Sequence, residues 1–407
     1  MKLNYLAFAI PIFLLFTALE YWVARKQQKE DYFHFDRSIV NISIGIAERL
    51  ADLFTVGIFY YFYTYIHTHF ALFDIKPSIL LWLALFLCTD FVWYWYHRLA
   101  HEISLLWSVH VVHHQSEDFN YTVSARITVF QALVRVVFWS VLPWIGFPPE
   151  MITSILLIHG AYPFFIHTRT IGKLGILEYI LVTPSHHRVH HASDEHYLDK
   201  NYGDVLIIWD KIFGTFVEEK EEPHYGLTKP LNSHSFLWQH FHFILELMYT
   251  VKHTQGWGNK IKIIFGGPDL VPEYVREKLE QRFLFNKSVN ASGIRFKNYV
   301  IWQIGSVLLS LFLVILFEHQ ISLSLQIGVA LLIVLTLINC GAILEQRTWV
   351  FYLEYTRLAT ATLFAYIYFG PTSIVVFGSL FVVTLICFFT WFEKQYLRLI
   401  YGSAVAS

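Results

Sequence analysis

The chain has 407 residues, of which 55% are hydrophobic, 18% aromatic and only 15% charged, against roughly 25% charged in an ordinary soluble domain. Its net charge of -1 creates no overall field that would favour a nucleic acid as partner. This composition excludes a disordered chain and is typical of a protein embedded in lipid.

Three apolar runs open the chain. The first, residues 3–19, lacks a small-residue cleavage site and has a basic flank, so we expect a retained membrane helix. The second, residues 39–66, contains three charged residues that we expect to face protein rather than lipid. The third, residues 79–96, ends in aromatic side chains, as expected where a helix leaves hydrocarbon for the headgroup layer. The charged residues of the second run are Glu48, Arg49 and Asp52.

The middle of the chain alternates between polar and apolar segments. A polar, histidine-rich segment over residues 97–126 is followed by two apolar runs, 127–145 and 151–166. A Pro-Pro turn separates these two runs, which predicts a membrane hairpin. The mainly polar stretch over residues 167–295 is then expected to be the largest extramembrane part.

Four further apolar runs close the chain, over residues 299–317, 323–344, 350–369 and 373–391. They carry no catalytic pattern, so we expect a membrane scaffold there. The predicted domains are therefore a membrane domain over 1–298, with a catalytic region at about 90–216, and a four-helix membrane module over 299–407.

Lysine and arginine residues follow the first run and crowd the large polar stretch, which makes both segments cytoplasmic by the positive-inside rule. If the first membrane helix ends in the cytoplasm, counting the membrane crossings that follow places both histidine-rich segments on the cytoplasmic face. The predicted fold is an all-α, multi-pass membrane bundle with a cytoplasmic, histidine-rich helical cap for two metal ions and an extra C-terminal helical module. The membrane would be the endoplasmic reticulum in a eukaryote and the inner membrane in a bacterium.

Histidine is unusually abundant, with 21 residues, of which twelve fall between 97 and 196. They include one HxxxH box and two HxxHH boxes. The boxes are His97 and His101; His110, His113 and His114; and His187, His190 and His191. Because positions i, i+3 and i+4 share a helix face, we expect each box to present its imidazoles toward one point. Eight imidazoles exceed what one ion accepts, which predicts two ions.

Several other uses of the boxes fit less well. Closed structural zinc sites usually include cysteine, and the three cysteines lie far apart in apolar surroundings. Metal transport would place ligands at mid-membrane, and a bis-histidine haem needs one partner on each of two helices. Two ions at the edge of a bilayer would suit oxygen activation on a lipid chain, although imidazole alone does not select iron over zinc or copper.

At these residues the sequence resembles the fatty acid hydroxylase/sterol desaturase superfamily, whose pattern is HxxxH, HxxHH and HxxHH. Longer stretches within about 90–268 are similar to its ether-lipid-cleaving branch, the alkylglycerol (glyceryl-ether) monooxygenases. These stretches are 97–102, 106–107, 110–120, 183–191 and 199–216.

The resemblance implies a di-iron monooxygenase that hydroxylates the ether-bearing carbon of an alkylglycerol from the bilayer. The resulting hemiacetal collapses to a fatty aldehyde and glycerol. It also implies O2 as oxidant, with tetrahydrobiopterin, the reductant of the animal enzymes, as one candidate electron donor; the sequence itself identifies no pterin site. Two alternatives stay open: a hydroxylase or desaturase of a fatty acyl chain or sterol, and a non-catalytic, metal-handling membrane protein.

Carried over by position, the eight box histidines are the expected metal ligands, and His167 is an additional one. His186 adjoins the third box but breaks its spacing, and His159 is expected to be a satisfied polar residue. Nearby polar residues are candidates either to accept the outward N–H of a ligating imidazole or to cap helices. These candidates are Glu102, Glu117, Asp118, Asn120, Asp204 and Asp210.

Overall fold

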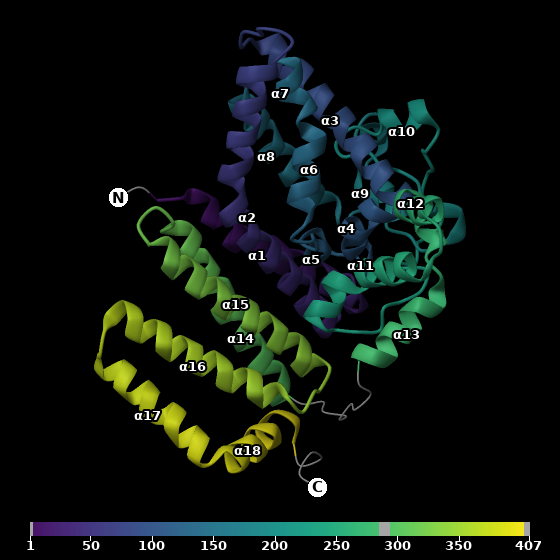
Figure 1. The fold of residues 1–407 in the computed structure, drawn as a ribbon. Coiled ribbons are helices and arrows are strands. Elements are labelled where there is room, and N and C mark those ends of the chain that lie inside the picture. The colour runs from purple at the N-terminus through teal and green to yellow at the C-terminus, as the bar shows by residue number, and fades with distance from the viewer. Residues whose placement is uncertain (1–2, 285–293, 403–407) are drawn as a thin grey trace. The chain divides into compact units, whose positions relative to one another are not determined.

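The computed structural model describes residues 3–284 and 294–402, and Figure 1 shows that they form helices joined by loops. Two isolated β-bridges occur, but the described residues contain no strand. Five described helices are long and apolar enough to cross a membrane, or six if one bent pair is a single span. The fold is therefore that of a multi-pass helical membrane protein, as predicted.

The α-helices are α1 (Ala9–Lys26), α2 (Phe35–Phe70), α3 (Ile79–Glu102), α4 (Ser104–His114), α5 (Tyr121–Ser124), α6 (Gln131–Trp139), α7 (Val141–Ile145), α8 (Pro149–Ile166), α9 (Pro184–His190), α10 (Ile208–Phe213), α11 (Phe236–His253), α12 (Trp257–Phe265), α13 (Glu273–Phe283), α14 (Ile294–Leu316), α15 (Leu323–Leu344), α16 (Val350–Phe369), α17 (Ser373–Cys387) and α18 (Phe389–Tyr401). Short 3-10 helices are η1 (Tyr5–Phe8), η2 (Glu30–Tyr32), η3 (Gly175–Tyr179), η4 (Glu195–Tyr197) and η5 (Pro268–Leu270).

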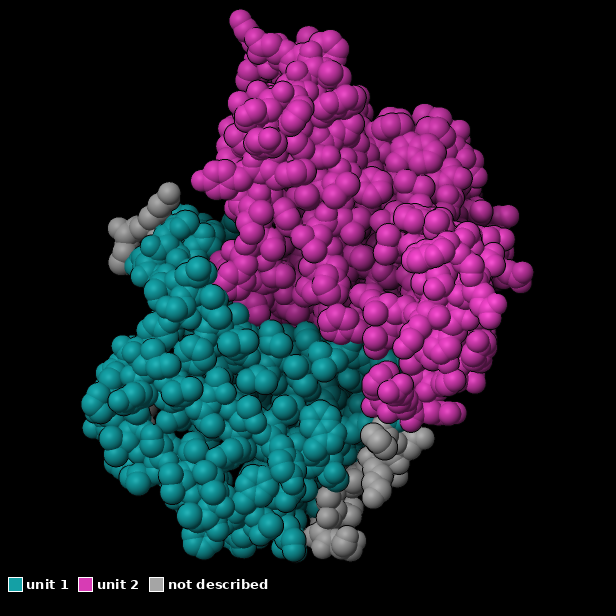
Figure 2. All heavy atoms as spheres, in the orientation of Figure 1, with its two compact units in different colours: residues 1–14, 233–239, 284–407 teal, residues 15–232, 240–283 magenta. Residues whose placement is uncertain are grey.

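The chain divides into two compact units, which Figure 2 distinguishes by colour. Unit 1 comprises residues 1–14, 233–239 and 284–407, and unit 2 comprises residues 15–232 and 240–283. The domain boundary predicted at residue 298 stays a prediction, and residues 285–293 just before it lie outside the described residues.

Several apolar helices begin at a serine or threonine that caps them. The Ser78 hydroxyl accepts the amide hydrogen of Leu81 at the start of α3, and Ser322 and Thr372 do the same for α15 and α17. These caps satisfy amide groups that would otherwise lack a partner at a helix start. The cap at Ser322 fits the start of α15, which matches the apolar run predicted at 323–344. α16 matches the run predicted at 350–369 without a side-chain cap.

The last apolar run, predicted over 373–391, is not one helix. α17 and α18 meet at Phe388 with axes 98° apart. The reason lies in the composition of α18, which carries Lys394 and Arg398 and buries Leu397 and Ile400. A helix with charges on one side and apolar residues on the other cannot continue into hydrocarbon at the same cost as α17.

The charges inside α2 are placed only partly as predicted. Glu48 is buried and pairs with Arg49 and Arg135, and Asp52 forms an ion pair with Arg49 at 3.0 Å. The Arg49 side chain itself is half exposed and folds back onto its two acidic neighbours. The two carboxylates thus face protein, whereas the guanidinium reaches the surface.

The predicted hairpin is present in unit 2. α6 and α7 form one arm and α8 the other, and the chain reverses at Gly146, whose φ is +125°. A Cβ at this glycine would lie 2.1 Å from the Phe73 carbonyl oxygen, so only glycine fits. Pro149 then begins α8 at a position where its missing N–H costs nothing.

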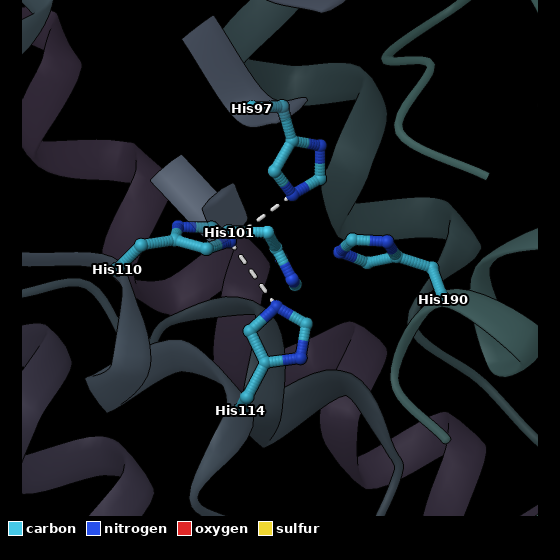
Figure 3. A group of neighbouring side chains, drawn as sticks. All are labelled: His97, His101, His110, His114 and His190. Carbon is cyan, nitrogen blue, oxygen red and sulfur yellow. Dashed lines mark hydrogen bonds between the residues drawn. The ribbon is translucent and has the colours of Figure 1, made fainter. Parts of the chain in front are cut away.

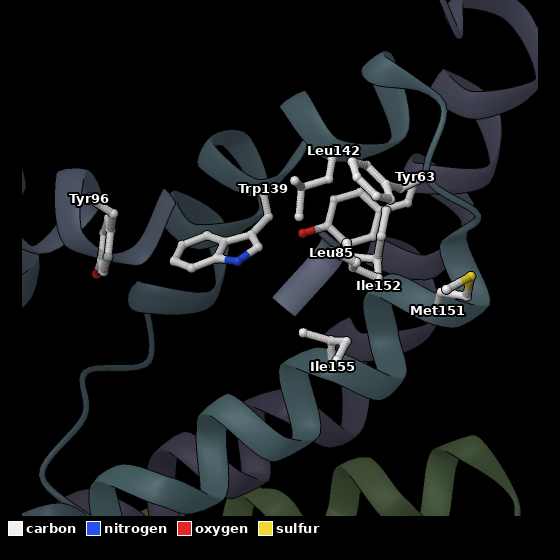
Figure 4. Packing of buried hydrophobic residues seen from close by; sticks show 9 residues of the cluster. Tyr63, Leu85, Tyr96, Trp139, Leu142, Met151, Ile152 and Ile155 are labelled. Carbon is white, nitrogen blue, oxygen red and sulfur yellow. The ribbon is translucent and has the colours of Figure 1, made fainter. Parts of the chain in front are cut away.

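A buried apolar cluster holds the hairpin against α2 and α3 (Figure 4). Trp139 on α6 lies fully buried, with its ring edge-to-face against Trp93 and Tyr96 of α3 at 5.3 and 5.5 Å. The other members include Tyr63, Leu85, Leu142, Phe147, Met151, Ile152 and Ile155. The cluster therefore fixes the end of α3 that immediately precedes His97.

Candidate metal centre

Nine buried histidines of unit 2 form two adjoining groups, and they are the nine predicted ligands. In each group one ligand atom per residue lies within 4.8 Å of all the others, as found among the described residues. The five-histidine group contains His97, His101, His110, His114 and His190. The four-histidine group contains His113, His167, His187 and His191.

The expectation that each box converges on one point is confirmed for His97 and His101 but wrong for the two HxxHH boxes. In both HxxHH boxes the first and last histidines join one group, and the middle one joins the other. On a helix with about 3.6 residues per turn, positions i and i+4 lie about 40° apart, whereas i+3 lies on the other side of i. The boxes on α4 and α9 therefore exchange their middle histidines, His113 and His190, between the two groups.

The five-histidine group is arranged around one centre (Figure 3). The Nε2 atom of His110 lies 3.0 Å from His97 Nε2 and 3.1 Å from His114 Nε2. The Nε2 atoms of His101 and His190 are buried and have no hydrogen-bond partner within the described ranges. Buried polar atoms are normally satisfied, so these two nitrogens indicate a ligand that binds there.

The four-histidine group has the same character. His167 Nε2 lies 3.1 Å from His113 Nε2 and 3.0 Å from His187 Nε2. His191 Nε2 lies 3.1 Å from His113 Nε2. An ion about 2.1 Å from each of two imidazole nitrogens at right angles holds them about 3 Å apart, so these spacings fit a metal.

His167 completes the four-histidine group from outside the boxes. It lies just after α8, where its Nδ1–H donates to the Pro163 carbonyl at 2.5 Å. His186, next to the third box, belongs to neither group: its Nδ1 accepts the Thr183 amide hydrogen at 3.4 Å in the capping box of α9. The family resemblance thus predicted the place of His167, and the broken box spacing is consistent with His186 standing outside both groups.

One short turn, residues 199–202, orients three members of the five-histidine group. An imidazole that donates Nδ1–H to an oxygen carries its lone pair on Nε2, which is the form a metal needs. The three contacts are His97 to the Tyr202 carbonyl at 2.8 Å, His190 to the Lys200 carbonyl at 2.9 Å, and His101 to the Asp199 carboxylate at 3.3 Å.

The turn is itself firmly held. Asp199 and Asn201 adopt left-handed φ angles of 58° and 54°, a region that Asn and Asp tolerate better than most residues. The Asn201 amide donates to the carbonyls of His186 and Val217, and Asp210 accepts the amide hydrogens of Tyr202 and Gly203. Asp210 thus acts through the turn and touches no metal-site histidine in the described residues.

The other acidic and amide candidates do not support the imidazoles as predicted. Within the described ranges, no hydrogen bond joins Glu102, Glu117, Asp118 or Asn120 to the nine histidines. Their partners are Arg98 for Glu102, Arg37 for Glu117, His34 and Arg37 for Asp118, and Tyr32 and Thr122 for Asn120. These side chains reach nearby cations or cap α5 instead.

Asp204 belongs to a third buried group, with Asp90 and His159. The His159 Nδ1–H donates to Asp204 at 2.6 Å, and Asp90 accepts the amide hydrogens of Val205 and Leu206. Ligand atoms of one ion lie about 3 Å apart or more, so the 2.6 Å contact holds a proton rather than a metal. The group links α3, α8 and the segment after the turn.

Burial keeps the imidazoles of α4, α9 and His167 neutral. Burial, and then the neighbouring imidazoles, lower the pKa of the six histidines on α4 and α9 well below the ordinary value. Burial lowers the pKa of His167 to about 4. These seven imidazoles are therefore neutral at pH 7, and each keeps one N–H while its other nitrogen is free to bind a metal. Among the described residues neither group includes a carboxylate, so the donor set is entirely imidazole and suits a divalent transition metal.

The comparisons with known proteins agree with this arrangement. A family model described as fatty acid hydroxylase matches residues 82–215. Alkylglycerol monooxygenase of Homo sapiens is 36% identical over 353 residues, which cover 84% of this chain and 78% of that protein. The Xenopus tropicalis protein of that name is 40% identical over 236 residues, covering 58% and 52%, and that of Danio rerio is 34% identical over 270 residues, covering 66% and 60%. No solved structure matches the chain.

Proposed function

This chain belongs to the fatty acid hydroxylase family, in the group of the alkylglycerol monooxygenases, and we propose that it is a di-iron membrane monooxygenase acting on alkylglycerol lipids. The observation that carries the proposal is the pair of adjoining histidine groups with inward Nε2 atoms. Such a pair provides separate places for two ions side by side.

In this proposal the nine histidines of the two groups are the metal ligands and each group holds one iron. The metal pair, when bound, supplies the reductive activation of O2 that the protein side chains cannot perform. We assign tetrahydrobiopterin as the reductant from the relationship to the alkylglycerol monooxygenases.

The reaction is a hydroxylation of the carbon beside the ether oxygen. One oxygen atom of O2 enters the C–H bond, the other leaves as water, and two electrons and two protons come from the reductant and solvent. The hemiacetal then breaks its bond to the former ether oxygen, which leaves a fatty aldehyde and glycerol.

The protein contributes a dry and rigid site. Trp107 packs against His101 and His114 at 5.0 and 5.7 Å, and Phe119 stacks on His167 at 5.5 Å. The Tyr225 ring also stacks on Phe119, with ring centroids 4.9 Å apart. Excluding water from such a centre protects the reacting species from side reactions.

The position of the centre favours a substrate that arrives from the bilayer. His97 and His101 occupy the last turns of α3, which is one of the candidate membrane spans. A long alkyl chain could stay in hydrocarbon while its ether carbon reaches the metals. We propose a cytoplasmic orientation of the centre, with catalysis in residues 1–298 and a scaffold role for 299–407.

The test is an aldehyde assay on purified protein in lipid vesicles. We expect release of fatty aldehyde from a 1-O-alkylglycerol, dependent on O2 and a reductant, and no release from the matching ester-linked monoacylglycerol. Hydroxylated or desaturated products from a fatty acyl chain or a sterol, with none from the alkylglycerol, would show that the substrate class is wrong. Metal flux across the vesicle membrane without any O2 consumption would overturn the enzyme assignment.

A further inference from the structure

Residues 174–180 and residue 212, in the polar segment that follows the hairpin in the sequence, expose a cluster of large apolar side chains. Ile176 and Tyr179 of η3 are 81% and 72% exposed, and Ile212 of α10 is 66% exposed. We define the apolar patch as Leu174, Ile176, Leu177, Tyr179, Ile180 and Ile212, all exposed. None of these residues belongs to a candidate membrane span of the described chain.

The two halves of the patch form one surface. The Lys211 ammonium donates to the carbonyl oxygens of Tyr179 and Glu178 at 2.9 and 3.3 Å. The Ile207 amide donates to the Ile180 carbonyl at 3.0 Å. These main-chain contacts hold η3 beside α10, so their exposed side chains cannot move apart freely.

The patch continues from the aromatic end of a membrane span. The Phe213 ring of α10 stacks on Tyr94 of α3 at 5.3 Å and packs against Trp95 at 5.2 Å. Trp209, also on α10, packs against Phe91 at 5.0 Å. α10 therefore lies beside α3 (Figure 1) at its aromatic residues 91–95, the kind of residues that mark the boundary of hydrocarbon and headgroups.

We propose that this apolar patch inserts into the interface of the lipid bilayer, as a non-spanning membrane contact of the extramembrane cap. Its side chains are those that enter the boundary between acyl chains and headgroups, and tyrosine and lysine are common at that depth. A water-exposed apolar surface of this kind normally marks an interaction site, and its continuity with α3 selects lipid as the partner.

The charges around the patch indicate which lipids it needs. Lys173 pairs with Glu218 at 2.6 Å, and Lys211 is engaged by main-chain carbonyls. Neither lysine is presented as an isolated charge, so attraction to anionic headgroups is not required. Apolar burial drives the contact, and a zwitterionic phosphatidylcholine bilayer suffices.

The patch is joined closely to the four-histidine group. Ile180 lies four residues before Pro184, which begins α9, and α9 carries His187. The Tyr162 hydroxyl donates to the Val182 carbonyl at 2.5 Å and ties this connection to α8. Insertion of the patch would therefore set the depth of that metal group relative to the bilayer, whatever reaction the centre performs.

The experiment measures the depth of a fluorophore in the full-length protein. In a background with Cys88, Cys340 and Cys387 replaced by alanine, NBD is attached at Ile176→Cys, and the protein is reconstituted in phosphatidylcholine vesicles. We expect strong quenching by doxyl-labelled phosphatidylcholine and several-fold weaker quenching by aqueous iodide. The control is Glu195→Cys on η4, an exposed acidic position, where the order of the two quenchers should reverse.

A second label at Ile212→Cys tests the other half of the patch independently. Equal iodide quenching at positions 176 and 195 would overturn the proposal, and so would a label shielded from both quenchers, because it would indicate a protein partner. Replacing part of the phosphatidylcholine by phosphatidylserine should leave the quenching unchanged; a strong dependence would overturn the inference that apolar burial suffices. The readout requires no activity, so it fails or succeeds separately from the enzyme assignment.

Discussion

At the scale of single residues, Asn201 is the position on which the turn beneath the five-histidine group depends. Its amide side chain bridges two carbonyls, and its amide oxygen accepts the Val217 amide hydrogen at 2.9 Å. Its left-handed φ of 54° places the Lys200 and Tyr202 carbonyls on either side toward His190 and His97. Through this turn, a residue that binds no metal controls which imidazole nitrogen carries the proton.

We therefore predict that Asn201→Ala weakens metal binding. Alanine removes the hydrogen bonds that hold the turn and is strained at positive φ, and loss of such support typically costs about 10–100-fold in metal affinity. Chelator competition on the purified protein measures this. Asn201→Gly, which relieves the strain alone, should show a similar loss. The matched control is Asn232→Ala, an exposed asparagine with φ of 47°; equal metal affinity of the Asn201 and Asn232 variants would contradict the role of the turn.

All nine histidines of the two groups could be predicted from the sequence: eight from the spacing of the boxes, and His167 from the family resemblance. The sequence did not predict their supports. The carbonyls of Lys200 and Tyr202 carry no side-chain signal, and Asp199 was missed because its role arises from the fold of the turn. The placing of His113 and His190 in the opposite group to their box neighbours could have been predicted from the angles between helix positions i, i+3 and i+4 alone.

At the scale of elements, the close approach of α2 to the residues after α5 fixes the place of residues 125 and 126, which follow the second histidine box. A Cβ on Gly45 would lie 2.6 Å from the Ala125 Cβ and 2.9 Å from the Ala125 carbonyl oxygen. The next residue, Arg126, offers its carbonyl to His113 at 3.2 Å. Glycine at position 45 therefore permits a contact on which the four-histidine group depends.

Gly45→Ala should destabilise the protein by about 1–3 kcal/mol, the usual cost of overpacking a tight contact. Thermal unfolding in detergent measures the loss. Gly57→Ala in the same helix is the matched control, because a Cβ there meets nothing within 4 Å, and a better helix former should leave stability unchanged or raise it by about 0.5–1 kcal/mol. Equal unfolding temperatures for the two variants would contradict the contact.

How well each helix could be predicted from the sequence depended on its hydropathy. Runs that cross lipid carry a strong signal, so α15 and α16 were predicted with their bounds. The break between α17 and α18 was missed, because apolar composition continues past Phe388 while the charges that turn the helix come later. The loops of the polar segment, including the 199–202 turn, have no periodicity from which to predict them.

At the scale of the whole molecule, unit 1 has a polar centre of its own. Glu354 on α16 collects partners from α14, α15 and α18. They are Tyr299, Gln303, Asn339, Tyr396 and Arg357. Polar groups inside a membrane module are costly unless they are paired, so this centre serves to join the four helices, and it lies outside both histidine groups.

Glu354→Ala should therefore destabilise unit 1 and leave the metal content unchanged. Removing one partner of a fully buried ion pair costs about 3–5 kcal/mol; this pair is only partly buried, so we expect a smaller loss, with the Arg357 charge left behind. Thermal unfolding and elemental analysis of the same sample measure both effects. The control is Glu318→Ala, which removes only a contact to the half-exposed His319. A fall in metal content of the folded Glu354 variant would contradict the division of roles between scaffold and centre.

The central claim is that two groups of imidazoles hold two separate ions, and the metal-to-protein ratio tests it most directly. Elemental analysis of the purified protein should give about two irons per chain, one for each group. His190→Ala should lose the ion of the five-histidine group and His113→Ala that of the four-histidine group, while His196→Ala, a half-exposed residue outside both groups, should keep the full content. A wild-type ratio of one or below, or an unchanged ratio in both ligand variants, would contradict the account.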